Sequence, residues 1–247
     1  MIIDAHVHVD DVPALGWHLP AELVLRQMDE AGVDVSVIMT ITDAPEVNRE
    51  ALQMLADVMQ EHPGRFEAYA RMHPWTADSE RLLVHGIREL GYCGLKLHPV
   101  SSIGHPADES SLRLMRAAAR LGAPTMLHCG DDPFCTPLEI EQAAIRVPEC
   151  TLVMAHLGAY LHGDDVIAVC ERNPNTMVDT SCCPYPWRIR EAIDRCGVER
   201  VIWGSDGPGC PPGIELAKLD RVPGLTAAER QALVHDNQRR LIVGVER

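Results

Sequence analysis

Eight short apolar segments alternate with longer amphipathic segments along most of this 247-residue chain. Each apolar segment has the length of a strand, and each amphipathic segment has the length of a helix. Strands that alternate with helices form a parallel sheet, and eight such repeats close into a (β/α)8 barrel, the TIM barrel. The strands are predicted over residues 2–8, 33–40, 66–72, 94–98, 124–128, 151–156, 176–181 and 201–205.

Between these segments, apolar residues recur at helical spacing. Helices are predicted over residues 20–31, 45–61, 77–90, 108–121, 137–146, 163–172 and 186–196, and glycines follow several of them as helix stops. A last helix is predicted over 226–243, where Thr226 and Glu229 have the spacing of a capping box. No low-complexity linker interrupts the pattern, so residues 1–247 are expected to form a single α/β domain.

The charge of the chain argues against two classes of partner. Lys and Arg number 22 against 36 Asp and Glu, a net charge of −14, which provides no attraction to nucleic acid or to an anionic membrane. No apolar run approaches the length of a membrane span and no signal peptide is recognisable, so we expect a cytoplasmic protein. The nine cysteines form no CxxC pair, which favours reduced thiols over a disulfide framework.

Polar residues stand where the apolar segments end. They are His6, His8, Lys96, His128, His156 and Asp206. The carboxyl ends of the strands of a parallel barrel meet at one face, and catalytic groups gather there. Imidazole and carboxylate groups are the usual nitrogen and oxygen ligands of zinc. The pattern therefore predicts a metal site that supports catalysis at this face of the barrel.

The histidines differ in how strongly their positions indicate a metal. His6 and His8 are two residues apart on a strand, so both side chains leave the same face and can bind one ion. A single strand-end histidine, such as His128 or His156, is also compatible with a hydrogen-bonded surface group. Beside the pair on the first strand, His128 is favoured as a ligand, whereas His156 is left open between a ligand and an acid–base group.

Asp206 closes the last predicted strand. Its carboxylate could bind a metal through one oxygen and accept a proton from metal-bound water through the other. The alternative is an Asx turn or a helix cap before Gly207 and Pro208. Because several histidines are expected opposite Asp206, the metal-binding and catalytic role is favoured.

The motifs at these positions resemble the amidohydrolase superfamily. They are most similar to its amidohydrolase-2 branch of decarboxylases and lactone or amide hydrolases, related to aminocarboxymuconate semialdehyde decarboxylase. The motifs are Asp4-Ala-His-Val-His, Gly94-Leu-Lys-Leu-His-Pro, His128, Ala155-His-Leu-Gly and Gly204-Ser-Asp. The resemblance implies a divalent metal, usually zinc, held by His6, His8, His128 and Asp206. It also implies that His156 acts nearby as an acid–base or transition-state residue.

Lys96 admits two interpretations. In binuclear members of the superfamily, a lysine of the fourth strand is carboxylated and bridges two metals, so a ligand set for two metals is formally present. The favoured alternative is one metal per chain and an ammonium group that pairs with Asp4 or another inward carboxylate. His98 shares the strand face of Lys96 and is expected to line the substrate cavity.

Weaker candidates lie near the same end of the barrel. Arg71 and His73, placed on a loop, could bind a substrate carboxylate or be solvated charges. Several aromatic residues follow strands, where they either wall a ligand or pack over the rim. They are Trp17, Trp75, Tyr160, Tyr185 and Trp187. Cys129 is expected to point away from the metal and to pack.

Three functions are compatible with this site. The leading hypothesis is a hydrolase in which zinc-bound water attacks a lactone, amide or ester of a small molecule. The second is a lyase that decarboxylates an unsaturated or aromatic acid with the same residues. The third is a barrel that binds metal and ligand without turnover, and it is disfavoured because acid–base groups accompany the ligand set. Homo-oligomerisation is left open.

Overall fold

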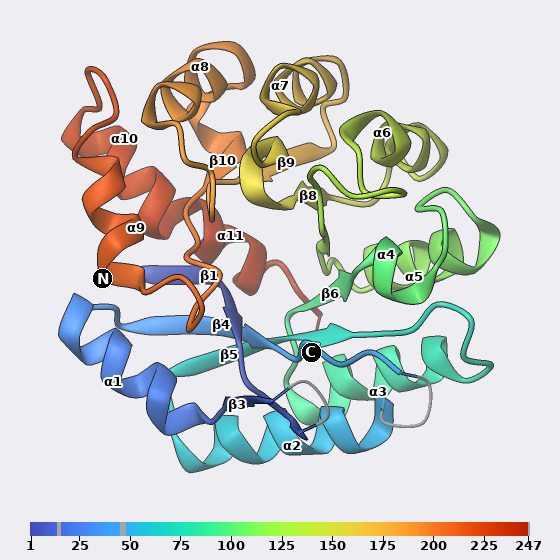
Figure 1. Cartoon of the computed structure of the whole chain (residues 1–247). Coiled ribbons are helices and arrows are strands. Elements are labelled where there is room, and N and C mark those ends of the chain that lie inside the picture. Colours follow the sequence, from blue (N-terminus) through green and yellow to red (C-terminus); the bar gives the residue numbers. More distant parts are fainter. Residues whose placement is uncertain (14–15, 45–47, 247) are drawn as a thin grey trace.

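A computed structural model describes residues 1–13, 16–44 and 48–246. Eight parallel strands form one sheet in the order β1-β4-β5-β6-β7-β8-β9-β10, with helices around it (Figure 1). The strands are β1 (Ile3–His8), β4 (Val35–Met39), β5 (Phe66–Arg71), β6 (Gly94–Leu97), β7 (Thr125–Leu127), β8 (Leu152–Met154), β9 (Thr176–Asp179) and β10 (Val201–Ile202). The predicted TIM barrel is confirmed, and every one of these strands lies within a predicted one.

The last strand is short, and backbone hydrogen bonds beyond its end close the barrel against β1. The Asp206 N–H donates to the His6 carbonyl at 2.8 Å, and the His8 N–H donates to the Gly207 carbonyl at 2.7 Å. Val7 and Gly207 form a parallel bridge between them. The segment that carries Asp206 therefore runs directly alongside the strand that carries the histidine pair.

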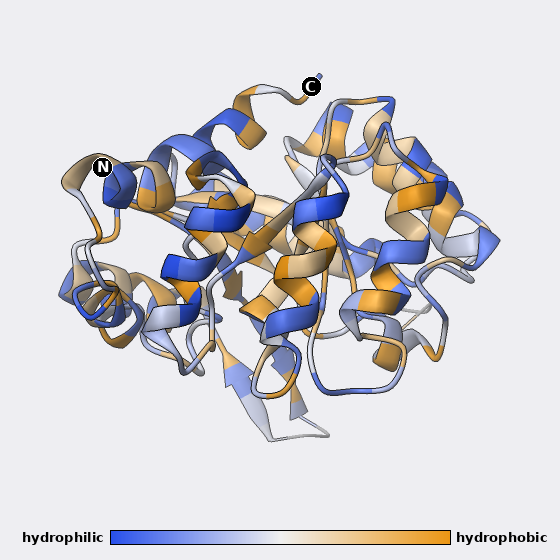
Figure 2. Ribbon diagram, turned by 90° about the horizontal axis from the view of Figure 1, so that it is seen from above, coloured by the Kyte–Doolittle hydropathy of each residue, from blue (hydrophilic) through white to orange (hydrophobic). Residues whose placement is uncertain are grey.

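The helices that follow the strands pack on the outside of the barrel (Figure 1). They are α1 (Ala21–Ala31), α2 (Asn48–Glu61), α3 (Ser79–Leu90), α5 (Glu109–Ala119), α6 (Pro137–Arg146), α7 (Gly163–Arg172) and α8 (Pro186–Cys196). Figure 2 shows hydrophilic and hydrophobic residues alternating along them, as amphipathic helices require. Residues 45–47, the start of one predicted helix, lie outside the described residues. None of the described helices is long and apolar enough to cross a membrane.

Several short elements were not predicted. Strands β2 (Asp10–Val12) and β3 (Trp17–Leu19) form an antiparallel hairpin that projects from one end of the barrel (Figure 2). Helix α4 (Pro99–Ser102) follows β6, and α9 (Pro212–Leu219) follows β10. Segments of three or four residues are too short to show a period in the sequence. The hairpin and α4 both continue from carboxyl ends of barrel strands, so they lie at the end where the site was predicted.

The predicted C-terminal helix is continuous but not uniform. It comprises α10 (Ala227–Gln231), a π-helical turn η4 (Ala232–Asp236) and α11 (Asn237–Val243). The predicted capping box is confirmed, because the Glu229 N–H donates to Thr226 Oγ1 at 3.2 Å and the Thr226 N–H donates to the Glu229 carboxylate at 2.8 Å. Within the π-helical turn, the Leu233 carbonyl accepts from the Trp203 N–H at 3.0 Å. The irregular turn thus binds the helix to the last strand.

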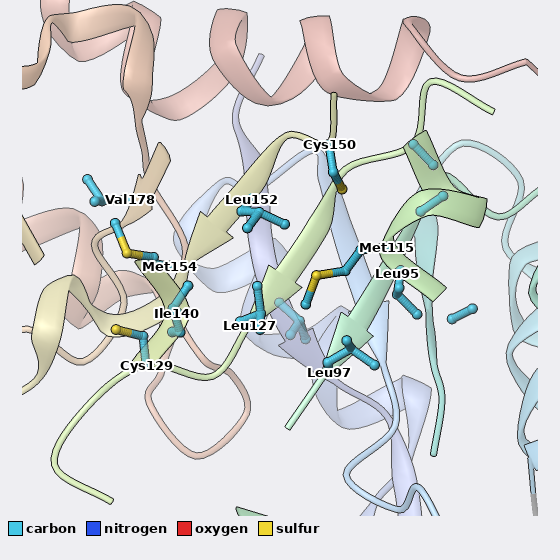
Figure 3. Close-up of a cluster of buried hydrophobic side chains, with 14 of the residues drawn as sticks. Leu95, Leu97, Met115, Leu127, Cys129, Ile140, Cys150, Leu152, Met154 and Val178 are labelled. Atoms are coloured by element: carbon cyan, nitrogen blue, oxygen red, sulfur yellow. The ribbon is translucent and has the colours of Figure 1, made fainter. Parts of the chain in front are cut away.

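Two apolar layers hold the barrel together. The outer layer lies between strands and helices, and Figure 3 shows Leu95, Leu97 and Leu127 of the strands beside Met115 of α5. The inner layer fills the barrel with side chains from alternate strand positions, including Ile3, Val37, Tyr69, Met126, Val153, Met177 and Ile202. Gly94 belongs to this packing, because a Cβ there would lie 2.4 Å from the Tyr69 ring.

Candidate metal centre

A cavity of about 160 Å³ lies at the carboxyl ends of the barrel strands. All the residues that the sequence singled out as ligands, acid–base groups or main substrate-lining candidates border it. They are His6, His8, Trp17, Arg71, Lys96, His98, His128, His156 and Asp206. The structure therefore brings the candidate residues to one place, and their contacts distinguish what each of them can do.

His6 is oriented by a buried carboxylate. Its Nδ1 lies 2.9 Å from Asp179 Oδ2 at the end of β9, and both side chains are fully buried. Burial alone would raise the pKa of Asp179, but the hydrogen bond and charge of His6 lower it to about 2. An ionised carboxylate only accepts hydrogen bonds, so His6 carries its proton on Nδ1 and its Nε2 has a lone pair that can bind a metal. Carboxylate–histidine pairs of this kind orient metal ligands.

The same carboxylate orients two more histidines through Ser181. The Ser181 hydroxyl donates to Asp179 Oδ2 at 2.6 Å, so its oxygen accepts from His156 Nδ1–H at 3.0 Å. His156 Nε2 then accepts from His128 Nδ1–H at 3.1 Å. This assignment of protons follows from the carboxylate at one end of the chain. It leaves a lone pair on His128 Nε2, with Asp132 Oδ2 3.5 Å away.

Asp179 and Ser181 were missed in the sequence. A single aspartate in a strand has no partner at a recognisable spacing, and Ser181 is one of many serines. The only available signal was an ionisable residue within an otherwise apolar predicted strand, which requires a partner if it is buried. That partner, His6, lies 173 positions away in the chain.

Asp206 converges with both histidines of β1. Its Oδ1 lies 3.1 Å from His8 Nε2 and 3.4 Å from His6 Nε2. Two donors that bind one ion at about 2.1 Å each, at octahedral or tetrahedral angles, lie about 3.0–3.4 Å apart. Each of the two imidazole nitrogens thus lies from Asp206 Oδ1 at the spacing of two ligands of one metal, although His8 is not part of the group of ligand atoms that all lie within 4.8 Å of one another.

His156 and His128 compete for the remaining position. The donor atoms of His6, His156 and Asp206 lie within 4.8 Å of one another. His128 lies outside that group, and its ring stacks on His98 with 4.0 Å between the ring centroids. Distance favours His156 as the neighbour of a metal, whereas the hydrogen-bond directions leave the free nitrogen on His128. The choice between ligand and acid–base group that the sequence posed for His156 therefore becomes a question for experiment.

The protonation states of the site follow from burial and crowding. Burial lowers the pKa of His156 to about 4. Burial, together with the charge of Arg71, lowers the pKa of Lys96 to about 8. Burial alone would raise the pKa of Asp206, but the two histidines of β1 hold it well below its usual range. At neutral pH the site presents neutral imidazoles around an ionised carboxylate, the protonation states in which these groups bind metals.

Lys96 contacts a histidine and not a carboxylate. Its ammonium lies 3.0 Å from His6 Nε2, and it forms no ion pair within the described part of the chain. Asp4 instead accepts from the backbone N–H groups of His6 at 3.2 Å and Ser205 at 2.8 Å. The predicted pair between Lys96 and Asp4 is wrong, because Asp4 joins β1 to the segment before Asp206. A metal on His6 Nε2 would use the lone pair to which Lys96 now donates, so that hydrogen bond must break on metal binding.

Arg71 is the last residue of β5 and is buried, so the alternative of a solvated loop charge is wrong. Its guanidinium donates to the Thr40 carbonyl at 3.2 Å, the Asp43 carboxylate at 3.4 Å and the Ser101 hydroxyl at 3.1 Å. These three partners hold the planar group in one orientation at the cavity wall. His73 lies in the following loop and does not border the described cavity.

A second cavity of about 430 Å³ adjoins the first and shares His128, His156 and Asp206 with it. Of the aromatic candidates, Trp17 borders the smaller cavity and Tyr160 borders the larger one. The three others, Trp75, Tyr185 and Trp187, are exposed and line neither cavity within the part of the chain that the structure describes. Cys129 is fully buried in the outer apolar layer, as predicted.

The segments after three strands have strained backbones. The φ angles are 64° at His156, 56° at Cys182 and 66° at Asp206. Left-handed conformations of this kind cost roughly 1–3 kcal/mol each for residues other than glycine, and they concentrate at functional sites. Gly204 has a different constraint, because a Cβ there would lie 2.8 Å from Asp179 Oδ1. Backbone strain and close approach both mark this end of the barrel as a functional site.

Comparison with known proteins agrees with this geometry. A family model described as amidohydrolase matches residues 3–242, which is nearly the whole chain. A search of curated proteins finds no match. The chain is similar to solved TIM-barrel structures over almost its full length.

Three of these structures illustrate the likeness. A 5-carboxyvanillate decarboxylase from Sphingomonas paucimobilis has 16% identity and a TM-score of 0.79, with 98% of each chain covered. A dihydroxybenzoic acid decarboxylase from Polaromonas sp. JS666, with bound manganese and an inhibitor, has 17% identity and a TM-score of 0.77, covering 98% of this chain and 96% of that one. An uncharacterized TIM-barrel protein from Bordetella bronchiseptica has 18% identity and a TM-score of 0.80, covering 100% and 99%. Identities this low establish a shared fold.

Proposed function

Because the chain belongs to the amidohydrolase family and is an enzyme of that family, we propose that it is a metal-dependent decarboxylase of a small unsaturated or aromatic carboxylic acid. Two of the similar structures described above are decarboxylases of aromatic acids, which supports this reaction over the hydrolysis favoured by the sequence alone. The two adjoining cavities, about 160 Å³ and about 430 Å³, have together the size of a small-molecule site, roughly 300–1,000 Å³.

The proposed metal ligands are His6, His8, His128 and Asp206. The distances from Asp206 Oδ1 to the two histidines of β1 and the unprotonated Nε2 atoms of His6 and His128 support this set. When bound, a divalent metal would act as a Lewis acid on a substrate oxygen. We propose zinc, one ion per chain, with manganese as the second metal to test because a similar structure contains it.

The observation that carries the proposal is the positive charge of the cavity wall. Lys96 is 1% exposed and has no carboxylate partner in the described residues, and it lies beside the buried guanidinium of Arg71. A buried cation without an ion-pair partner is costly. Arg71 is paired with Asp43, so it is Lys96 that favours an anionic ligand at the cavity wall. A carboxylic acid, ionised at neutral pH, meets this requirement, whereas a neutral lactone, ester or amide does not.

The same charges suit the chemistry of decarboxylation. When the carbon–carbon bond breaks, carbon dioxide leaves and the bonding electron pair stays on the substrate carbon. The ammonium of Lys96 and the guanidinium of Arg71 would stabilise the negative charge that develops there. A proton must then reach that carbon, and His156, which borders both cavities, is the proposed donor. Its Nε2 accepts from His128 in the structure, so it would donate only after taking up a proton at that nitrogen. Ser181 and Asp179 keep the imidazole of His156 in place behind it.

Hydrolysis is the second candidate, and one observation favours it. Asp206 remains ionised because the neighbouring histidines lower its pKa, so it can accept a proton from an attacking water. In that reaction Asp206 would be the base, and His156 would protonate the leaving group or stabilise the developing charge. Both reactions use the same residues, so the products distinguish them.

The test is a paired substrate panel. Protein reconstituted with zinc or with manganese is incubated with hydroxybenzoates and other unsaturated acids, and carbon dioxide release is measured. A parallel set of lactones, esters and amides is followed by acid release. We expect carbon dioxide from at least one aromatic acid. Hydrolysis of a neutral substrate with no carbon dioxide from any acid would replace the decarboxylase assignment with a hydrolase.

Lys96→Met provides the matched control, because methionine has a similar length and no charge. If positive charge selects the substrate, KM for the acid should rise at least about tenfold in Lys96→Met, a loss of roughly 1.4 kcal/mol in binding. Metal content should be unchanged. A variant with the KM of the wild type would show that Lys96 does not recognise the acid.

A further inference from the structure

Two cysteine side chains meet at the mouth of the site. Cys182 follows β9 and Cys210 follows β10, and their sulfur atoms lie 3.3 Å apart. Neither residue lies in a helix or strand, so neither is held by a ladder of backbone hydrogen bonds. A disulfide requires about 2.05 Å between the sulfurs, which small side-chain rotations could reach. The sequence does not indicate this pairing, because 28 positions separate the two residues.

These two thiols are also the accessible ones. The described residues include all nine cysteines, and seven of those are buried whereas Cys182 and Cys210 are partly exposed. Cys182 borders the larger cavity together with His128, His156 and Asp206. Cys129 borders the same cavity but is fully buried, so a reagent that enters the cavity meets Cys182 as its partly exposed thiol, with Cys210 directly behind it.

The pair is joined directly to Asp206. The Cys182 thiol donates to Asp206 Oδ2 at 3.3 Å, and the Cys210 N–H donates to the Asp206 carbonyl at 3.3 Å. Asp206 thus has one of its carboxylate oxygens facing His8 and the other facing a thiol. A covalent change at the thiols would act on the carboxylate oxygen that does not face the histidine.

We propose that Cys182 and Cys210 form a reversible disulfide when the protein meets a peroxide, and that this disulfide lowers the activity that depends on Asp206. The modification goes beyond the proposed function, and its formation does not depend on which reaction the site catalyses. It is compatible with a protein whose other thiols stay reduced, because disulfides in reducing compartments are usually transient and redox-sensing.

The chemistry balances with the peroxide as oxidant. One thiolate attacks a peroxide oxygen, so a sulfur–oxygen bond forms and the oxygen–oxygen bond breaks, which releases water or an alcohol. The second thiol displaces the hydroxyl group from the first sulfur, which forms the disulfide and releases water. The two thiols together lose two electrons and two protons, and the peroxide takes up both. A small-molecule thiol reverses the reaction by exchange.

The expected consequence for Asp206 follows from its contacts. A disulfide has no S–H group, so Asp206 Oδ2 loses the donor that Cys182 provides. The new bond also ties the segment after β9 to the segment after β10, on either side of Asp206. Removal of a positioned acid or base costs roughly 10²–10⁴ in rate. Because oxidation disturbs Asp206 but does not remove it, we expect a smaller loss, about tenfold.

The decisive measurement is a thiol map of the folded holoenzyme before and after treatment with hydrogen peroxide. Alkylation without denaturant should label two thiols in the reduced protein and none after oxidation. Tryptic digestion should then yield residues 173–188 linked to residues 201–218. Dithiothreitol should restore both the labelling and the activity.

Single variants identify the bond. Cys210→Ser should keep the activity of the reduced wild type, lose the linked peptides and lose the reversible inactivation. Cys183 lies in the same peptide as Cys182 but is buried, so Cys183→Ser should keep the linked peptides. Oxidation of both thiols to sulfinic acids without any linked peptide would overturn the proposal. So would linkage through Cys183, or linked protein with full activity.

Discussion

The inner apolar layer of the barrel and the polar mouth next to it are built by the same strands, only a few residues apart. On β1, Ile3 packs inside the barrel, whereas His6 faces the candidate metal position. On β6, Gly94 packs against the Tyr69 ring, and two residues later Lys96 is buried with no ion-pair partner among the residues that the structure describes. Along each of these two strands, residues whose packing stabilises the fold are followed by polar residues that are costly to bury.

The backbone follows the same division. No described residue within the barrel strands has a positive φ, although the register of β1 against β4 shifts between Asp4 and Val7. Beyond the strands, His156, Cys182 and Asp206 adopt left-handed conformations. Strain of this kind persists only when the surrounding structure holds it in place. The rigid apolar layers therefore provide the stability that lets the mouth keep unfavourable conformations. In TIM barrels generally, residues at the carboxyl ends of the strands carry the chemistry, and residues at the opposite end and in the interior carry the stability. Mutations in this chain can therefore test the two regions separately.

The largest effect is expected for Asp206→Asn. Asparagine keeps the shape but loses the negative charge of a proposed metal ligand, which in the hydrolytic alternative is also the base. Turnover should therefore fall by about 10⁴-fold, the upper end for a positioned acid or base. The free energy of unfolding of the metal-free protein should fall by no more than about 1 kcal/mol, because functional groups are seldom optimal for stability. Steady-state kinetics and denaturant titration measure both quantities. Near-normal turnover at full metal occupancy would remove Asp206 from the mechanism.

His156→Ala should have the next largest effect on activity. If His156 is the proton donor and not a ligand, its loss should lower turnover by roughly 10²–10⁴-fold while metal content per chain stays at the wild-type value. Elemental analysis of protein purified without chelator decides the question. Loss of the metal from this variant would make His156 a ligand, as the distances to His6 and Asp206 allow.

Ile140→Ala tests the apolar layer. Ile140 is fully buried between α6 and the strands (Figure 3), so the cavity left behind should lower the free energy of unfolding by roughly 2–5 kcal/mol. Turnover per folded molecule should be unchanged. Ile145→Ala is the matched control on the same helix, because Ile145 is 64% exposed and its loss should cost less than about 0.5 kcal/mol. Equal losses in the two variants would contradict the described core.

Metal removal should lower the stability of the folded protein by an amount between the effects of Ile140→Ala and Thr226→Ala. A metal at a free concentration one hundred times its Kd stabilises the folded state by about 2.7 kcal/mol. Chelation should therefore lower the thermal midpoint of the wild type, and added zinc should restore it. His128→Ala should lose most of this metal-dependent shift if His128 is a ligand. A midpoint that does not respond to chelator or to zinc would contradict the metal site.

Thr226→Ala should have the smallest effect, far from the mouth. It removes the side chain that caps α10, so the free energy of unfolding should fall by about 1 kcal/mol. Thr226→Ser is the matched control, since serine can still accept from the Glu229 N–H. Activity should be unchanged in both variants. A change in kcat for either one would show that the C-terminal helix influences the site.

The sequence alone determined the order and type of the main elements. Apolar periodicity is local, so eight strands and the helices between them could be predicted from neighbouring residues. The positions of His6, His8, His128, His156 and Asp206 followed from one further step, because the carboxyl ends of barrel strands must meet. Short elements such as the β2–β3 hairpin were missed because a few residues carry no periodic signal.

Only the tertiary structure decided which groups contact which. It joined Asp179 to His6, gave Asp4 a backbone partner in place of Lys96, and placed Cys182 against Cys210. These contacts link residues far apart in the chain, and they depend on strand register, on the closure of the barrel and on left-handed residues after the strands. Periodicity reports which face of an element is buried. It does not report which buried polar group will find which partner, since that is settled when all the strands pack together.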